Sequence, residues 1–328
     1  MFATGLPAVS MSFFSGISIV IVVPSAIAVF AWLATIWLGR PVITTAFLFF
    51  SSMILLFVIG GVSGFMTASI PVDWQLTDTY FVVAHLHYVL IGINVFPVIG
   101  AVYFWFPKMT GRLLDERLGR WNFWTMFIGF NLAFLPMHVT GLLGMPRRVY
   151  TYGPGMGWET LNLVTTIGSF VLALGVLLFI INVLKSLRVG VPAGANPWDA
   201  PTLEWAVSSP PPAYNFAVIP TVASRHPLWE ARLGTRGARS SVDQGMLLDT
   251  GKETLGTSAL NAHPDMVLEM PKDSSAPFLL AVGTAVLFVG LLLRQGVTVG
   301  IGTAIAALAL LFWLWPRQEL REREAAHG

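Results

Sequence analysis

The chain has 328 residues, of which 55% are hydrophobic and only 11% charged, and its mean hydropathy is +0.71. These values are typical of a polytopic membrane protein and exclude a soluble globular domain. The sequence contains no cysteine, so disulfides and thiolate-bound metals are excluded, and any metal must use histidine or oxygen ligands. The net charge of +2 is too small to indicate nucleic-acid binding.

Apolar segments of about 20 or more residues recur along the chain and predict membrane helices. Two apolar runs near the end, 277–293 and 298–315, are separated by a polar turn and end in tryptophans, which is typical of a membrane hairpin with interfacial aromatic residues. The expected fold class is an all-α polytopic membrane protein with about seven transmembrane helices. The five earlier helices are expected at about 11–38, 43–67, 79–107, 116–142 and 157–185.

Polarity divides the chain into four parts. We expect a five-helix membrane part at 1–186 and a polar, extended cytoplasmic segment at 187–275. A C-terminal transmembrane hairpin at 276–316 and a charged cytoplasmic tail at 317–328 would follow. The polar segment is rich in proline, glycine and serine, as in Ser208-Ser209-Pro210-Pro211-Pro212, which favours a position outside the membrane.

Basic loop residues predict the orientation of the helices, because they prefer the cytoplasmic side. The loop between the fourth and fifth helices would then face outside, yet it carries Arg147 and Arg148. Two guanidiniums there would suit carboxylates through charge-assisted hydrogen bonds, or lipid headgroups. The residues that define the cytoplasmic side are Lys108, Arg112, Arg117, Arg120, Lys185 and Arg188.

His85 and His87 lie two residues apart inside the third membrane segment. Ionisable groups at membrane depth are costly and usually functional. On a helix that turns about 100° per residue, positions i and i+2 point about 200° apart, so the two rings face opposite sides. One helix could thus hold two metal centres about 10 to 15 Å apart, an electron-relay geometry. A hydrogen-bonded core histidine and a proton-relay group are the alternatives, whereas chelation of one metal needs pairs three or four residues apart.

The residues around this pair resemble a known family. The stretch Asp78-Thr79-Tyr80-Phe81-Val82-Val83-Ala84-His85-Leu86-His87-Tyr88-Val89-Leu90 is similar to the tenth-helix signature of subunit I of heme–copper cytochrome c oxidases. The resemblance covers roughly residues 1–230, as helices eight to twelve of a twelve-helix subunit. Other matching segments are Met1-Phe2-Ala3-Thr4-Gly5, Phe30-Ala31-Trp32-Leu33-Ala34-Thr35, Trp105-Phe106-Pro107, Gly144-Met145-Pro146-Arg147-Arg148, and Leu203-Glu204-Trp205 through Pro210-Pro211-Pro212.

The resemblance implies a role for each matching polar residue. His85 is expected to be the proximal ligand of the high-spin, oxygen-binding heme, and so the catalytic ligand. His87 is expected to supply one axial ligand of the low-spin heme. Arg147 and Arg148 would hold the heme propionates, and Tyr80 would lie beside the same propionate layer.

Other positions carry the resemblance with departures. Asp78 matches a carboxylate that binds magnesium, but Thr77 stands where the family usually has a second magnesium-ligating histidine. In the first helix, Ala28 occupies the position of a proton-uptake lysine, with Ser25 in place of a threonine. An alanine cannot relay a proton, so another group or ordered water would have to substitute. His138 matches a family histidine, for which a hydrogen-bonded core role is favoured.

The implied function is that of a terminal respiratory oxidase of the bacterial cytoplasmic membrane, which reduces oxygen to water with four electrons and translocates protons. The expected cofactors are two hemes of the A type, one low-spin and one high-spin, with copper B ligated outside this chain, and magnesium. The family's copper ligands lie upstream of the segment matched at Met1, so we expect a truncated or split part of subunit I that is inactive alone. The expected partners are the N-terminal half of subunit I, a copper-bearing subunit II, subunit III, cytochrome c as donor, and membrane lipid.

Several alternatives stay open at this stage. A quinol-fed oxidase of the same superfamily would look the same over much of the chain. A nitric oxide reductase is related but fits the local sequence less well. A diheme cytochrome b pairs widely spaced histidines across two helices, whereas this chain shows one closely spaced pair. The remaining alternative is a non-catalytic membrane fragment or assembly partner.

Overall fold

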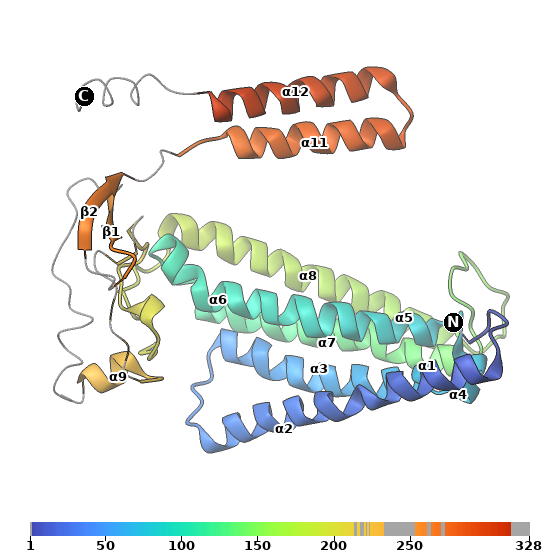
Figure 1. Ribbon diagram of the computed structural model, residues 1–328. Helices are drawn as coiled ribbons and strands as arrows, with labels where there is room; N and C mark the ends of the chain where they lie inside the picture. Colours follow the sequence, from blue (N-terminus) through green and yellow to red (C-terminus); the bar gives the residue numbers. More distant parts are fainter. Residues whose placement is uncertain are drawn as a thin grey trace. The chain divides into compact units, whose positions relative to one another are not determined.

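The computed structural model describes residues 2–212, 215–216, 220, 222, 224–232, 253–260, 264–269 and 273–315. The chain forms two compact units. The first consists of Met1–Asn215 with Pro220–Asp243, and the second of Phe216–Ile219 with Gln244–Gly328. Within the described residues both units are helical, apart from one two-stranded sheet in the second (Figure 1).

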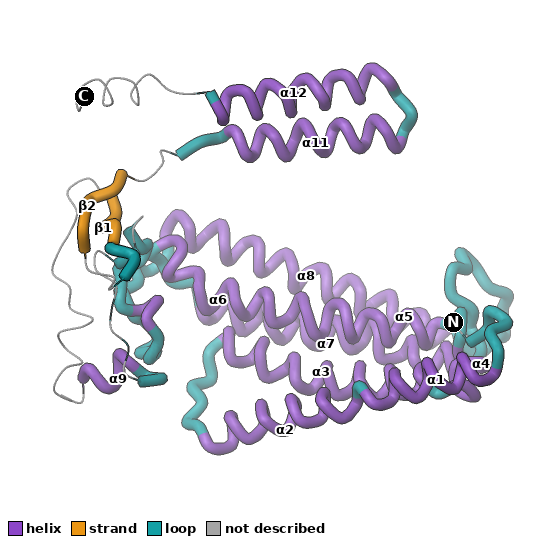
Figure 2. The backbone as a smooth tube through the Cα atoms, in the orientation of Figure 1, coloured by secondary structure: helices purple, strands orange, loops and turns teal. Residues whose placement is uncertain are grey.

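The first unit contains the five membrane helices expected from the sequence, with two changes of detail. The first helix is interrupted at Ile21, and the third has a π-helical middle, Tyr88–Val95, between α5 and α6. Figure 2 shows the loops that join the helices, of which the connection between α7 and α8 is long. The α-helices are α1 (Ala8–Val20), α2 (Val22–Leu38), α3 (Thr45–Ala68), α4 (Ile70–Leu76), α5 (Tyr80–His87), α6 (Phe96–Thr110), α7 (Glu116–Leu142), α8 (Glu159–Val189) and α9 (Pro227–Arg232).

Six stretches of the described residues are long and apolar enough to cross a membrane, which confirms the all-α membrane fold class. The seventh expected helix, α11 (Ala276–Leu292), is apolar but has only 17 residues. The six stretches are Ala8–Leu38, Thr45–Ala68, Tyr80–Thr110, Glu116–Leu142, Glu159–Val189 and Gly296–Leu314.

Aromatic rings and small residues hold the first unit together. Phe49 of α3 is fully buried among Phe96 and Tyr103 of α6 and Phe123 of α7. The α7–α8 contact is closer still, because a Cβ built on Gly168 would lie 2.3 Å from the Ala133 amide nitrogen. Without a hydrophobic driving force in lipid, such close backbone approach is what stabilises helix pairs.

Buried amides add polar bonds between these helices. The side-chain amide of Asn182 on α8 donates to the Tyr103 hydroxyl at 3.1 Å. That hydroxyl donates to the side-chain oxygen Oδ1 of Asn122 at 3.2 Å. Asp115 caps α7 by accepting from two backbone amides, and it also accepts from Lys185 at 2.7 Å. The Lys185 ammonium, followed by the capping amides, holds the pKa of Asp115 below its usual range. α6, α7 and α8 are thus joined at the end that carries the basic loop.

The second unit contains strands β1 (Glu253–Thr257) and β2 (Pro264–Glu269), which pair antiparallel, followed by α11 and α12 (Gly296–Leu314). The two helices form a hairpin where the sequence predicts one (Figure 1). Their buried residues are small and recur every seven positions, a period that keeps one seam of a helix facing its neighbour. These residues are Ala276, Gly283 and Gly290 on α11 and Gly302 and Ala309 on α12.

The polar segment expected to be extended over 187–275 contains more local structure than polarity alone indicates. The structure describes a 3₁₀ turn at Leu203–Trp205, the helix α9 and the β1–β2 hairpin within it. Trp198 donates its indole hydrogen to the Phe104 carbonyl at 2.8 Å, and its ring stacks on the Phe104 ring. These two contacts hold the segment against α6. The tail expected at 317–328 lies outside the described residues.

A buried lysine organises this segment. The Lys108 side chain of α6 is only 7% exposed, and its ammonium lies 5.2 Å from the centre of the Trp205 ring. The same Nζ donates to the carbonyls of Ala195 at 3.0 Å, Val207 at 2.8 Å and Ser208 at 3.2 Å. Every ammonium hydrogen therefore has a carbonyl partner, and residues far apart in the sequence are drawn onto one helix end.

We predict that Lys108→Met loosens the segment at 190–212, because three carbonyls lose their donor while the apolar volume is kept. The expected loss of stability is about 1–3 kcal/mol, the usual cost of leaving buried polar groups unpaired. Thermal unfolding in detergent and amide hydrogen exchange would measure it. Lys185→Met is the matched control, because that side chain is 48% exposed and pairs with one carboxylate. Equal losses in both variants would contradict the role given to Lys108.

Candidate functional site

The two histidines lie in the last turn of α5, just before the helix widens into its π-helical stretch. α5 begins after Thr79, whose hydroxyl accepts from the Phe81 amide at 3.3 Å and so caps the helix. π-helical turns are uncommon and are found mostly at functional sites. Both imidazoles are partly buried.

His85 faces α3. Its Nδ1 lies 3.1 Å from the Gly60 carbonyl oxygen and 3.1 Å from the Ser63 hydroxyl, and that hydroxyl itself donates to Gly60 at 3.0 Å. A carbonyl only accepts, so this network assigns the proton of His85 to Nδ1 and leaves a lone pair on Nε2. Gly64 makes room for the ring, since a Cβ there would lie 2.9 Å from Cε1 of His85.

His87 faces α7 instead. Its Nδ1 donates to the Val83 carbonyl at 2.7 Å, and its ring stacks on Phe134 with centroids 4.2 Å apart and planes 14° apart. The same argument assigns its proton to Nδ1 and its lone pair to Nε2. The two rings contact different helices, which agrees with the angular separation predicted from their spacing.

This arrangement fits two separate axial ligands. A metal-binding imidazole usually donates its second ring hydrogen to a carbonyl, which fixes the ring and raises its basicity. Both histidines meet this requirement, and no residue that the structure describes forms a hydrogen bond with either Nε2. The described residues gather no group of three or more histidine and carboxylate side chains around one point, so a protein-only metal cage is not formed among them. Histidine is a common axial ligand of heme iron, so each side of α5 offers one imidazole that could bind a separate heme.

A second cluster joins the start of α5 to the loop after α7. The Arg147 amide donates to the Asp78 carbonyl at 2.8 Å, and its Nε donates to the Asp78 carboxylate at 2.7 Å. Tyr80 donates its amide to the Met145 carbonyl at 3.0 Å. Two of the three residues predicted at the propionates, Arg147 and Tyr80, are thus brought close to Asp78. The third, Arg148, is exposed, with a left-handed φ of 67° and no hydrogen bond from its side chain to the described residues.

The magnesium role expected for Asp78 receives no support from this cluster. Its carboxylate is engaged by Arg147, and Thr77 adds no imidazole. Asp73, on the neighbouring α4, is the other acidic group nearby, and burial, with a smaller contribution from the charge of Asp78, raises the pKa of Asp73. The metal-ligand role therefore stays a prediction.

His138 lies in the core, as the sequence predicts. Its ring packs against Phe81 and Tyr88 with centroids 5.0 and 5.4 Å apart. The backbone of the preceding turn, at Leu135 and Phe134, lies next to the imidazole. Neither ring nitrogen forms a hydrogen bond of good geometry with the described residues, so the hydrogen-bonded role stays a prediction.

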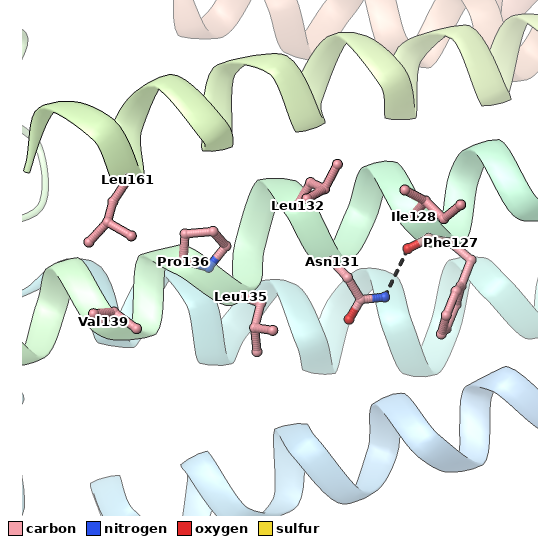
Figure 3. Close-up of a pocket in the computed structure, with 8 residues that line it drawn as sticks. All are labelled: Phe127, Ile128, Asn131, Leu132, Leu135, Pro136, Val139 and Leu161. Carbon is pink, nitrogen blue, oxygen red and sulfur yellow. Dashed lines mark hydrogen bonds between the residues drawn. The ribbon is translucent and has the colours of Figure 1, made fainter.

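Sequence reasoning also missed Asn131 of α7, because a lone amide in an apolar helix carries no motif. It accepts from the Tyr88 hydroxyl at 2.8 Å and donates to the Phe127 carbonyl at 2.8 Å. Figure 3 shows it within a groove of about 520 Å³ on α7. With that amide already bonded, the groove offers an apolar surface. Its lining is Phe127, Ile128, Asn131, Leu132, Leu135, Pro136, Val139 and Leu161.

Comparison with known proteins bears on this site directly. The sequence profile of the family described as "Cytochrome C and Quinol oxidase polypeptide I" matches residues 1–171, more than half of the chain. The chain belongs to this family. The match includes both histidines, the Asp78–Arg147 cluster and His138, so the oxidase subunit I resemblance is confirmed.

Curated relatives extend the match. The cytochrome c oxidase subunit 1 of Bacillus subtilis is 42% identical over 314 residues, covering 95% of this chain and 47% of that protein. That of Alkalihalophilus pseudofirmus is 39% identical over 334 residues, covering 100% of this chain and 50% of that protein. A probable cytochrome c oxidase subunit 1-beta of Nocardia farcinica is 48% identical over 232 residues, covering 70% of this chain and 39% of that protein. The chain thus spans about half the length of the first of these oxidase subunits.

We predict that Gly64→Ala disturbs His85, whereas Gly61→Ala does not. A Cβ at Gly64 meets the imidazole, whose bonds to α3 would have to change, but a Cβ at Gly61 meets nothing within 4 Å. Overpacking of this kind costs about 1–3 kcal/mol. Nitrogen-15 NMR of labelled histidines would report the tautomer and bonding of His85 in the two variants. Unchanged His85 signals in Gly64→Ala would contradict the packing described.

Proposed function

We propose that this chain is the C-terminal part of the catalytic subunit of a terminal respiratory oxidase, in which His85 ligates the high-spin heme and His87 the low-spin heme. The observation that carries the proposal is the state of the two imidazoles. Each has Nδ1 bonded to a backbone carbonyl and Nε2 unbonded, and each contacts a different neighbouring helix. The names of the curated relatives support the same reaction class.

The chain's own contribution is to hold two imidazoles in fixed orientations. The Gly60 carbonyl and the Ser63 hydroxyl fix the ring plane of His85, and stacking on Phe134 fixes that of His87. Hydrogen bonding of Nδ1 raises the basicity of Nε2, and apolar surroundings limit access of water, both of which influence a metal's reduction potential. When bound, two hemes of the A type with copper B supply the four-electron reduction of oxygen to water.

Cationic side chains would complete the site. We propose that Arg147 and Arg148 neutralise the heme propionates, with Tyr80 beside them, since guanidiniums bind carboxylates through paired hydrogen bonds. Copper B ligation, electron delivery by cytochrome c through a copper-bearing subunit II, and subunit III belong to the rest of the proposed complex in the bacterial cytoplasmic membrane.

Proton translocation is proposed to use a route other than α2. Ala28 has no group that carries a proton, and the Ser25 hydroxyl donates to the Ile21 carbonyl of its own helix at 2.9 Å. Ala28 has no hydrogen-bonding side chain, and the hydroxyl hydrogen of Ser25 is engaged within its own helix.

The heme assignment is tested with His85→Leu and His87→Leu in the assembled complex, since leucine has no atom that binds iron. We expect the first variant to lose the carbon monoxide-binding heme and keep the low-spin heme, because only its own axial bond is removed. The second should show the reverse pattern. Pyridine hemochrome analysis with carbon monoxide difference spectra measures both, and His226→Gln in the polar segment is the control. Retention of the full heme complement in both leucine variants would refute the assignment.

The electron donor is tested separately. The family description includes quinol oxidases, but the relatives compared above are named cytochrome c oxidases. We therefore expect the purified complex to consume oxygen with reduced cytochrome c and not with a quinol. Oxygen uptake with each donor, at equal complex concentration, decides between them, and faster uptake with quinol would reassign the donor.

A further inference from the structure

We propose that Asp78 is not a magnesium ligand in this protein but a positioning residue that holds Arg147 in place. The Asp78–Arg147 pair is formed entirely by residues of this chain. Its consequence, an oriented guanidinium for a heme propionate, rests on the function proposed above.

Asp78 binds Arg147 through two groups, its main-chain carbonyl and its carboxylate. Its main-chain carbonyl accepts from the Arg147 amide at 2.8 Å, its carboxylate oxygen Oδ1 accepts from Nε at 2.7 Å, and Nη2 forms an ion pair with the same oxygen. Asp78 has a left-handed φ of 59°, a conformation that a non-glycine residue adopts at some cost. That conformation lets the carbonyl and the carboxylate turn towards one residue.

Backbone contacts on both sides of the Asp78–Arg147 pair hold it in place. Thr79 and Pro146 form an isolated antiparallel bridge, and the Tyr80 amide donates to the Met145 carbonyl on the other side of it. The start of α5, two turns from His85 and His87, is thereby tied to the loop that carries Arg147. Any shift of α5 is transmitted to the guanidinium through the same bonds.

The exposed fractions of the two side chains indicate that Asp78 positions Arg147. The Asp78 side chain is 67% exposed, whereas that of Arg147 is 26% exposed, so the carboxylate lies outside and the guanidinium inside. Asp78 uses the Nε and Nη2 atoms of Arg147, and Nη1 forms no hydrogen bond with the described residues. Nη1 is therefore the part of Arg147 that remains available for an anionic ligand.

The same facts disfavour a metal at Asp78. Magnesium requires several oxygen ligands in near-octahedral geometry, whereas Oδ1 of Asp78 is already bonded to the Arg147 guanidinium. Thr77 replaces the second ligand of the family, and the described residues form no group of three metal-binding side chains. An ion pair thus occupies the place where the resemblance implies a metal.

The test combines metal analysis with a double-mutant cycle in the assembled complex. Cells would be grown with added Mn²⁺, which substitutes for Mg²⁺ and is visible by electron paramagnetic resonance. We expect no stoichiometric Mn²⁺ or Mg²⁺ that depends on Asp78. The variants are Asp78→Asn, Arg147→Gln and the double variant, and asparagine is chosen because it tolerates a left-handed φ.

Each single variant should lower the melting temperature, and the double variant should be no worse than Arg147→Gln alone, because Asp78→Asn removes only the pair that Arg147→Gln also removes. Asp78→Asn with Arg148→Gln is the matched control, and its effects should add, since Arg148 is not paired. One equivalent of Mn²⁺ that disappears in Asp78→Asn, or additive effects for Asp78 and Arg147, would overturn the proposal. Heme content would be measured on the same samples, and its loss would refute the proposed function, whereas the metal content and the coupling between Asp78 and Arg147 test this pairing.

Discussion

The hydrogen bond from each imidazole Nδ1 to a backbone carbonyl is the interaction on which the site depends. In the membrane interior a polar group without a partner costs several kcal/mol, so a histidine there keeps one orientation only if the protein supplies a bond. The Gly60 and Val83 carbonyls supply it for His85 and His87. Because a carbonyl cannot donate, the bond places the ring proton on Nδ1. The lone pair of Nε2 therefore remains available for a ligand.

Polar side chains at the end with the basic loop bond mainly to one another. Tyr103, Asn122 and Asn182 form one network, and Lys108 has a carbonyl for each ammonium hydrogen. The indole hydrogen of Trp205, which lies beside Lys108, has no partner among the described residues. Networks of buried hydrogen bonds strengthen one another in a low dielectric, so they hold the ends of α6, α7 and α8 in one arrangement.

The sequence predicted features that depend on local periodicity and motif, and missed those that depend on distant contacts. Helix periodicity alone placed His85 and His87 on opposite flanks, and the apolar runs predicted the membrane helices. The carbonyls around Lys108 lie about a hundred positions along the chain, and nothing in their side chains marks them. The Asp78–Arg147 pair was also missed, because the resemblance assigned the two residues to different ligands and gave no indication that they bind each other.

The two imidazoles depend on the rest of the fold in unequal ways. The Nδ1 partner of His87 belongs to its own helix, four residues earlier, so its tautomer survives as long as α5 remains helical. The partners of His85 belong to α3, and its ring fits there only because residue 64 has no Cβ. The orientation of His85 therefore depends on the packing of two helices, and changes in α3 reach the proposed oxygen-binding side before they reach the low-spin side. Dependence on tertiary contact is common where a protein must tune a reactive centre, because small shifts in packing adjust the ligand without altering the chemistry of the side chain.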